Sequence, residues 1–249
     1  MAVFGDYDVD GVTATCLLTD FLRKRGADCR TYIPGRMGEG YGLNPAAVRL
    51  LAGQGVTLIV TVDCGITANK EAELCRSLGI DLVVTDHHEC KTTLPAAIAV
   101  VDPHRPDQPD NAQHDLAGVG VAFKLAAAIS GDQTSLLDRF ADLLCLGTVA
   151  DVMPLTGENR TMAARGLRAL ANPKRVGIAA LMAECAVQKG PVTAGTIGYT
   201  LAPRINAAGR MGEVHVATEL FLTHDAARAV ELAGTLCRLN RKRQEIEGS

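Results

Sequence analysis

The sequence lacks several features that would place it in a common protein class. No apolar run among its 249 residues reaches the length of a membrane span, and its first residues lack the charged-then-apolar layout of a signal peptide. Its eight cysteines form no C-x-x-C pair and show no regular spacing, which argues against a disulfide framework or a zinc module. We therefore expect a soluble cytoplasmic protein with reduced thiols and no membrane partner.

An excess of positive charge is also missing. The formal net charge is −3, so the chain as a whole would not attract a polyanion. A nucleic-acid partner would need local basic residues, bound metal ions, or both. No phosphate-binding glycine loop follows the first predicted strand, which makes a general nucleotide-binding module a weak interpretation.

Apolar residues make up 47% of the chain, enough for a substantial core, and their pattern in the first hundred residues alternates between strands and helices. Asn44 followed by Pro45 is typical of a helix start. Strands that are apolar throughout and separated by helices indicate a parallel sheet covered on both faces. We predict a doubly wound α/β fold with a mainly parallel five-stranded sheet: strands at 1–5, 29–33, 56–62, 80–85 and 97–101, and helices at 12–24, 44–52 and 67–78.

The pattern after about residue 116 is helical, without convincing strands, repeats or low-complexity linkers. We expect an α/β catalytic region over residues 1–155 and, over 156–249, a helical C-terminal extension that packs on the same lobe. Its last helix stops in mid-pattern, and Gly248-Ser249 resembles a cloning remnant, so a fragment of a longer protein is expected. Helical spacing covers 118–130, 135–147, 159–171, 176–187 and 225–246.

Three carboxylates follow the first strand in the motif Asp6-Tyr7-Asp8-Val9-Asp10-Gly11. In an extended chain alternate side chains share a face, so Asp6, Asp8 and Asp10 would project together. Carboxylates that close repel one another unless cations lie between them. Asp10 could cap the following helix, but capping needs one carboxylate and not three. The motif therefore favours metal binding over a solvated acidic turn.

Further acidic and histidine residues follow other apolar runs. Asp63 ends one strand, the triplet Asp86-His87-His88 ends the next, and Asp151 follows the run 143–146. Asp63 is weak evidence alone, because an Asp after a strand is often a helix cap, and Asp151 means nothing by itself. Together with the first motif they form one constellation at the edge where an α/β sheet places its ligands. Oxygen ligands with one or two imidazoles suit manganese or magnesium better than zinc.

At these residues the sequence resembles the DHH phosphoesterase family, which is named for the triplet at 86–88. All four family motifs occur in order. Within the family, the chain is similar to the RecJ-type exonucleases over essentially its whole length. The segments that carry this second similarity are Gly5 to Gly11, Glu39-Gly40-Tyr41-Gly42, Leu116-Ala117-Gly118-Val119-Gly120 and Pro203-Arg204-Ile205-Asn206-Ala207-Ala208-Gly209-Arg210.

The resemblance implies a two-metal phosphodiesterase that digests single-stranded DNA from the 5′ end, in DNA repair and recombination, with two divalent cations, Mn or Mg. Asp8 and Asp10 would each bind one metal, Asp63 would bridge both, and His87 and Asp151 would complete the second site. The other two members of the site would act beside the metals: Asp6 would support the first motif and His88 would contact the reacting phosphate. Asp86 would orient a histidine rather than bind metal.

Five residues are candidates for holding DNA: Arg36, Tyr41, Arg204, Asn206 and Arg210. Guanidinium groups bind phosphate bidentately and a tyrosine can stack on a base. The alternatives are surface ion pairing for the arginines and a core role for the tyrosine. Residues 203–210 are polar, with a glycine near their end, and lack helical periodicity, which favours the functional interpretation there.

The RecJ-type proteins carry a second, C-terminal lobe that closes over the site, and nothing in this sequence supplies it. The expected substrate partner is single-stranded DNA, and a single-strand-binding protein or a helicase is a further candidate partner in the cell. Two other hypotheses stay open. One is a DHH phosphodiesterase for short oligonucleotides, cyclic dinucleotides or pyrophosphate, and the other is a catalytically silent DNA-binding scaffold.

Overall fold

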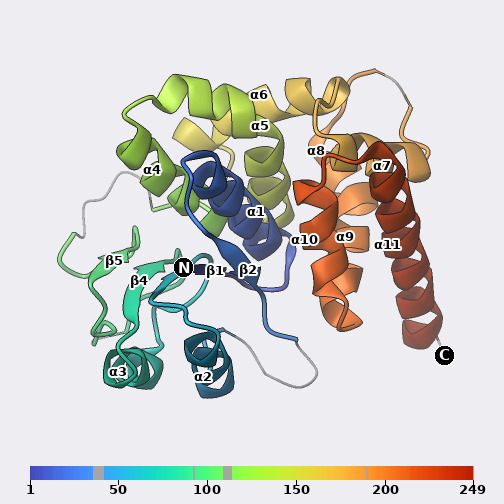
Figure 1. The fold of residues 1–249 in the computed structure, drawn as a ribbon. Coiled ribbons are helices and arrows are strands. Elements are labelled where there is room, and N and C mark those ends of the chain that lie inside the picture. The colour runs from blue at the N-terminus through green and yellow to red at the C-terminus, as the bar shows by residue number, and fades with distance from the viewer. Residues whose placement is uncertain (36–41, 92, 109–113, 189, 249) are drawn as a thin grey trace.

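The computed structural model describes residues 1–35, 42–91, 93–108, 114–188 and 190–248, and a five-stranded parallel sheet forms the centre of their N-terminal half (Figure 1). The strand order is β2-β1-β3-β4-β5, and every pairing is parallel. The chain moves outward from β1 to β2 and then returns to β3, so the topological switch point lies between β1 and β3. The predicted doubly wound α/β fold is confirmed. Its strands are β1 (Ala2–Phe4), β2 (Arg30–Tyr32), β3 (Leu58–Thr61), β4 (Asp81–Thr85) and β5 (Ala99–Val101).

Helices cover both faces of this sheet, as the apolar strands require. Ala2 and Phe4 point to one face, where they pack with α2 (Pro45–Gly53) and α3 (Asn69–Ser77). Val3 points to the other face, where the core contains α1 (Val9–Lys24) and the helices that follow the sheet. In Figure 1, α2 and α3 lie below the sheet, whereas α1 lies above it.

The helical part shares the core of the second face and begins with α4 and α5, which pack on α1. No described helix combines the length and the apolar character that crossing a bilayer requires. The division at residue 155 stays a prediction. The remaining bounds are α4 (Gly118–Ser130), α5 (Gln133–Ala150), α6 (Gly157–Ala171), α7 (Val176–Glu184), α8 (Ala194–Thr196), the π-helical turn η1 (Ile197–Leu201), α9 (Ala202–Arg210), α10 (Val214–Leu222) and α11 (Ala226–Glu247).

One sequence interpretation in this part is wrong. The pattern at residues 203–210 predicts a non-helical segment, but these residues form most of α9. Pro203 lies in the first turn, where its missing N–H costs no hydrogen bond. Ile205, Ala207 and Ala208 are buried, so apolar side chains form one face of the helix, and polar residues lie between them in the sequence.

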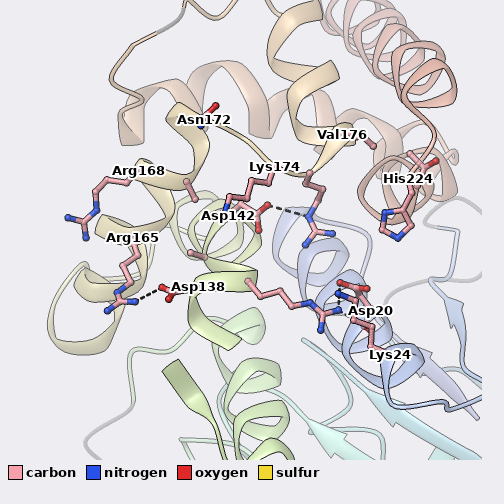
Figure 2. Close-up of a pocket in the computed structure, with 15 residues that line it drawn as sticks. Asp20, Lys24, Asp138, Asp142, Arg165, Arg168, Asn172, Lys174, Val176 and His224 are labelled. Atoms are coloured by element: carbon pink, nitrogen blue, oxygen red, sulfur yellow. Dashed lines mark hydrogen bonds and ion pairs between the residues drawn. The ribbon is translucent and has the colours of Figure 1, made fainter. Parts of the chain in front are cut away.

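A hollow of about 870 Å³ opens on the helical side of the molecule. Its walls come from α1, α5, α6, the start of α7 and the residues after α10 (Figure 2).

Candidate metal centre

The first acidic motif straddles the start of α1 rather than continuing β1. The strand ends at Phe4, and Asp8 is the N-cap of α1, with its Oδ1 atom accepting a hydrogen bond from the Gly11 amide at 2.9 Å. Asp10 lies in the first turn of the helix. The expected extended arrangement with three carboxylates on one face is therefore wrong, as is the suggestion that Asp10 caps this helix.

The helical turn divides the three carboxylates between two groups. Ligand atoms of Asp6 and Asp8 lie within 4.8 Å of one another and of an oxygen of Asp63. Asp10 instead belongs to a group with His87 and Asp151 that meets the same limit. A third group, Asp63, His87 and His88, joins the other two.

Asp10 is held from a second side by the N-terminus of α4. Its Oδ2 atom accepts a hydrogen bond from the Gly118 amide at 2.6 Å, and its Oδ1 atom accepts one from the Val119 amide at 2.9 Å. A Cβ at Gly118 would lie 2.6 Å from Asp63, and a Cβ at Gly147 would lie 2.6 Å from the Asp10 carboxylate. These glycines let two helices approach the carboxylates, a role that the sequence did not reveal.

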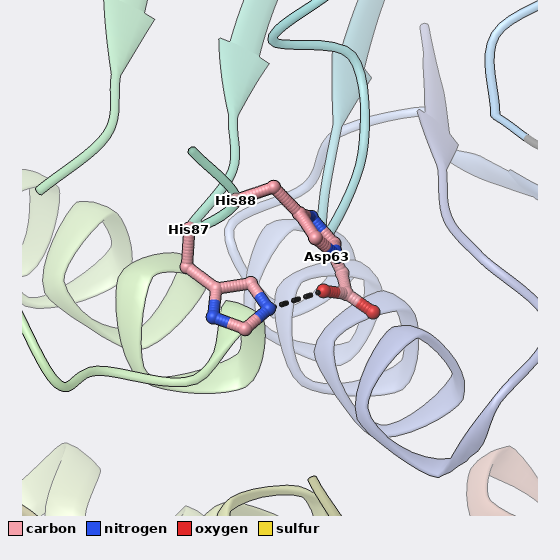
Figure 3. A group of neighbouring side chains, drawn as sticks. All are labelled: Asp63, His87 and His88. Carbon is pink, nitrogen blue, oxygen red and sulfur yellow. Dashed lines mark ion pairs between the residues drawn. The ribbon is translucent and has the colours of Figure 1, made fainter. Parts of the chain in front are cut away.

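Asp63 follows β3 in a conformation that an L-residue adopts only at a cost. Its φ is 59°, in the left-handed region, and its side chain is buried. Such strain costs about 1–3 kcal/mol and is concentrated at functional sites. Its Oδ1 atom lies 3.1 Å from Nε2 of His87 but makes no aligned hydrogen bond (Figure 3).

The triplet after β4 separates its three side chains by role. Asp86 accepts hydrogen bonds from the Ile66 amide at 2.9 Å and from the His87 amide at 2.8 Å, and its Oδ1 atom lies 2.7 Å from Nδ1 of His88. These contacts fix the His88 ring while leaving its side chain 46% exposed. His87 points inward, where its Nε2 atom faces Asp63, Asp10 and Asp151.

Asp151 reaches the same place from a helix. It is the C-cap of α5, and its Oδ2 atom lies 3.7 Å from Nε2 of His87. Its apolar run belongs to the buried face of α5, in agreement with the helical spacing over 135–147.

Burial and mutual repulsion raise the pKa values of the carboxylates. Burial, and then the charge of Asp8, raise the pKa of Asp6 to about 7 and that of Asp151 to about 6. The same two causes hold the pKa of Asp10 well above its usual range. For Asp63, burial and then the charge of Asp10 raise the pKa in the same way.

The pKa values of the two histidines shift in opposite directions. Burial, and then the neighbouring His88, lower the pKa of His87 to about 4, so its ring is neutral and can donate a lone pair to a metal. The hydrogen bond with Asp86 outweighs burial and raises the pKa of His88 to about 9, so its ring is a cation at neutral pH. Burial raises the pKa of Asp86, but its hydrogen bonds and the charge of His88 outweigh this, so the net pKa is lowered.

The donor set fits divalent cations. Crowded carboxylates and a neutral imidazole are ligands that Mn²⁺ and Mg²⁺ accept. Oδ1 atoms of Asp6 and Asp63 are buried without a hydrogen-bond partner in the described part of the chain, as expected of atoms oriented towards a cation. The residues present therefore fit the metals that the sequence predicts.

Of the residues predicted to hold DNA, Arg204 and Arg210 make contacts outside the three ligand groups. Arg36 and Tyr41 lie outside the described residues. Arg204 donates a hydrogen bond to the Thr200 carbonyl, and Arg210 is half-exposed, 4.0 Å from Glu247.

Asn206 has a structural contact that its sequence motif did not suggest. Its Oδ1 atom accepts a hydrogen bond from the Val9 amide at 3.1 Å, at the first turn of α1. It also lines a small hollow beside Asp8, Asp10 and Asp151. The helix that carries it therefore supports the first acidic motif.

Carboxylates and imidazoles gather beside the switch point of a doubly wound α/β fold. This combination of fold and site places the chain in the class of metal-dependent proteins. Residues 1–148 match the model of the DHH family, N-terminal domain. The chain belongs to this family.

Bacterial relatives of this chain carry the name "Single-stranded-DNA-specific exonuclease RecJ". The chain is 42% identical to that of Bacillus subtilis (strain 168) over 98% of its length, covering 30% of the relative. It is 40% identical to that of Escherichia coli (strain K12), with coverage of 98% and 45%. The chain thus spans less than half the length of these relatives.

Solved structures agree with this relationship. A crystal structure of exonuclease RecJ bound to manganese superposes with a TM-score of 0.90 and 39% identity, over 99% of this chain and 62% of the other. RecJ of Thermus thermophilus in complex with Mn²⁺ gives a TM-score of 0.86 and 37% identity, with coverage of 99% and 36%. The fold and the family predicted from the sequence are confirmed.

Proposed function

We propose that this chain is the metal-binding catalytic part of a phosphodiesterase that removes nucleotides from the 5′ end of single-stranded DNA. The observation that carries the proposal is the convergence of Asp8, Asp10, Asp63, His87 and Asp151 from four separate segments. The similarity to RecJ exonucleases supports the substrate. DNA repair in the cytoplasm, with a single-strand-binding protein or a helicase as partner, is the accompanying cellular role.

Two divalent cations, Mn²⁺ or Mg²⁺, are the proposed cofactors. Asp8 and Asp10 would each hold one ion, Asp63 would bridge them, and His87 and Asp151 would complete the second site. When bound, such cations lower the pKa of water and neutralise charge on a reacting phosphate.

The chain's own residues would position the substrate and the ligands. His88, which Asp86 keeps protonated and in place, would donate a hydrogen bond to a phosphate oxygen. Arg204 and Arg210 would contact the DNA backbone. For Asn206 the contact with the Val9 amide supports a positioning role beside the proposed substrate role.

The test is a nuclease assay with manganese on 5′-labelled single-stranded DNA, and with duplex DNA and dinucleotides as competing substrates. Asp63→Asn should abolish cleavage because the bridging position loses a charge. Asp102→Asn is the control, since it removes another buried carboxylate outside the three ligand groups. Metal binding is measured separately by calorimetry. A chain that binds manganese through Asp63 but cleaves dinucleotides in preference to single-stranded DNA would refute the proposed substrate.

A further inference from the structure

The hollow of Figure 2 is lined by charged side chains that the metal centre does not use. Six are basic and three are carboxylates, although the chain as a whole carries a net charge of −3. The local excess of positive charge would attract anions to this place. The basic residues are Lys24, Arg139, Arg165, Arg168, Lys174 and Arg175.

Three of the basic residues are held in place by the three carboxylates. Arg139 lies 2.8 Å from Asp20, and Arg175 lies 3.3 Å from Asp142. Arg165 pairs with the third carboxylate, Asp138. A guanidinium group has five N–H donors, so each paired arginine keeps donors for a ligand while its position is fixed.

The other three basic residues have no ion-pair partner among the described residues. Lys24 ends α1, Arg168 lies on α6, and Lys174 precedes α7, so they surround the hollow from different elements. The N-terminus of α7 opens at the same place, at Val176, and no described side chain caps it. Unpaired cations beside an uncapped helix start are a setting for a phosphate.

The size and the lining restrict the class of ligand. A volume of about 870 Å³ is within the usual range for a small-molecule site. None of the described residues that line the hollow carries a phenyl, phenol or indole ring, whereas sites for single-stranded nucleic acid combine positive charge with aromatic stacking. We propose that this hollow binds a small anion with several adjacent phosphate groups, of the inorganic oligophosphate or nucleoside triphosphate class.

The site is separate from the metal centre. Asp10 and Lys24 lie in the first turn and at the last residue of α1, which places them about 21 Å apart along the helix axis at 1.5 Å per residue. Loss of metal binding therefore does not remove this site, and the proposal stands independently of the proposed nuclease function.

Calorimetry on the whole 249-residue chain in EDTA tests the proposal, with sodium tripolyphosphate as the probe. One saturable site is expected. Arg168→Ala/Lys174→Ala should weaken binding by about tenfold or more, because two charge-assisted contacts are lost. Arg160→Ala/Arg241→Ala removes the same charge from exposed positions outside the hollow and should leave the affinity unchanged.

Two further measurements identify the ligand and show whether a variant is folded. ATP that binds as tightly as tripolyphosphate supports a site that reads phosphate alone, and tighter ATP binding supports a nucleotide site. Lys24→Gln, on another wall, should weaken binding as well, at an unchanged melting temperature. The proposal is overturned if tripolyphosphate does not bind, if both double variants weaken it equally, or if a single-stranded oligonucleotide binds there and tripolyphosphate does not.

Discussion

Removing the charge of Asp6 should stabilise the metal-free protein. Burial and the charge of Asp8 raise its pKa from the ordinary 3.8 to about 7 in the folded chain. The folded state then holds more protons than the unfolded state between these values, so stability falls as the pH rises from about 4 to 7. One pKa unit corresponds to about 1.36 kcal/mol. The raised pKa of Asp6 therefore lowers the free energy of unfolding by about 4 kcal/mol at pH 7.5, where the folded carboxyl is mostly ionised, and by about 2 kcal/mol at pH 5, where it is protonated.

Asp6→Asn imitates the neutral carboxyl and removes this cost. In EDTA the variant should melt above the wild type, and its advantage should be larger at pH 7.5 than at pH 5 by roughly 5–10 °C. Manganese at about 100 times its dissociation constant should raise the wild-type midpoint by roughly 5–11 °C at pH 7.5. The shift should be smaller in Asp6→Asn, because one ligand group has lost a charge.

Thermal melts at the two pH values, with EDTA and with manganese, provide the measurement. Asp102→Asn is the matched control: burial raises the pKa of Asp102 to about 6, but Asp102 lies outside the ligand groups. It should keep the full manganese shift. A repulsive role for the Asp6 charge is excluded if Asp6→Asn melts at or below the wild type in EDTA at pH 7.5, and a role in metal binding is excluded if the variant keeps the full manganese shift.

Three other substitutions test separate parts of the site. Asn206→Ala should lower the free energy of unfolding by about 1 kcal/mol through loss of the hydrogen bond from Val9, and calorimetry should show weaker manganese binding; unchanged metal affinity would contradict the positioning role. Gly118→Ala should abolish manganese binding, because its Cβ would collide with Asp63, and a metal-bound crystal of the variant would disprove this. Arg210→Ala should lower the slope of log affinity against log salt for single-stranded DNA by roughly 0.7, with manganese affinity unchanged; a wild-type slope would make Arg210 a structural residue.

The sheet could be predicted because each strand is an unbroken apolar run between helical patterns. The predicted bounds of its five strands and three helices differ from the structure by a few residues at most, as expected for element ends. Asn44 caps α2 as predicted, with its Oδ1 atom 2.9 Å from the Ala47 amide. Local patterns decide these features, so one sequence suffices.

The detailed geometry of the site could not be predicted, because it depends on contacts between distant segments. The sequence shows that Asp10 is acidic and close to β1, but only the fold brings α4 to its carboxylate. Similarly, Asn206 looks like a substrate contact in its polar segment until α9 is placed against the start of α1. Gly147 carried a usable signal, since it lies within α5, where alanine would be favoured, whereas Gly118 is the first residue of α4 and carried none.

Asp10 has a consequence for how this family can change during evolution. Its carboxylate is both a candidate metal ligand and the acceptor for two amides at the start of α4, so its replacement would disturb the core as well as the chemistry. Asp8 and Asp151 are less buried and, within the described chain, bind no second helix in this way. A descendant that abandons catalysis and survives as a scaffold can therefore lose Asp8 or Asp151 early, whereas Asp10 should persist long after selection for hydrolysis has ended.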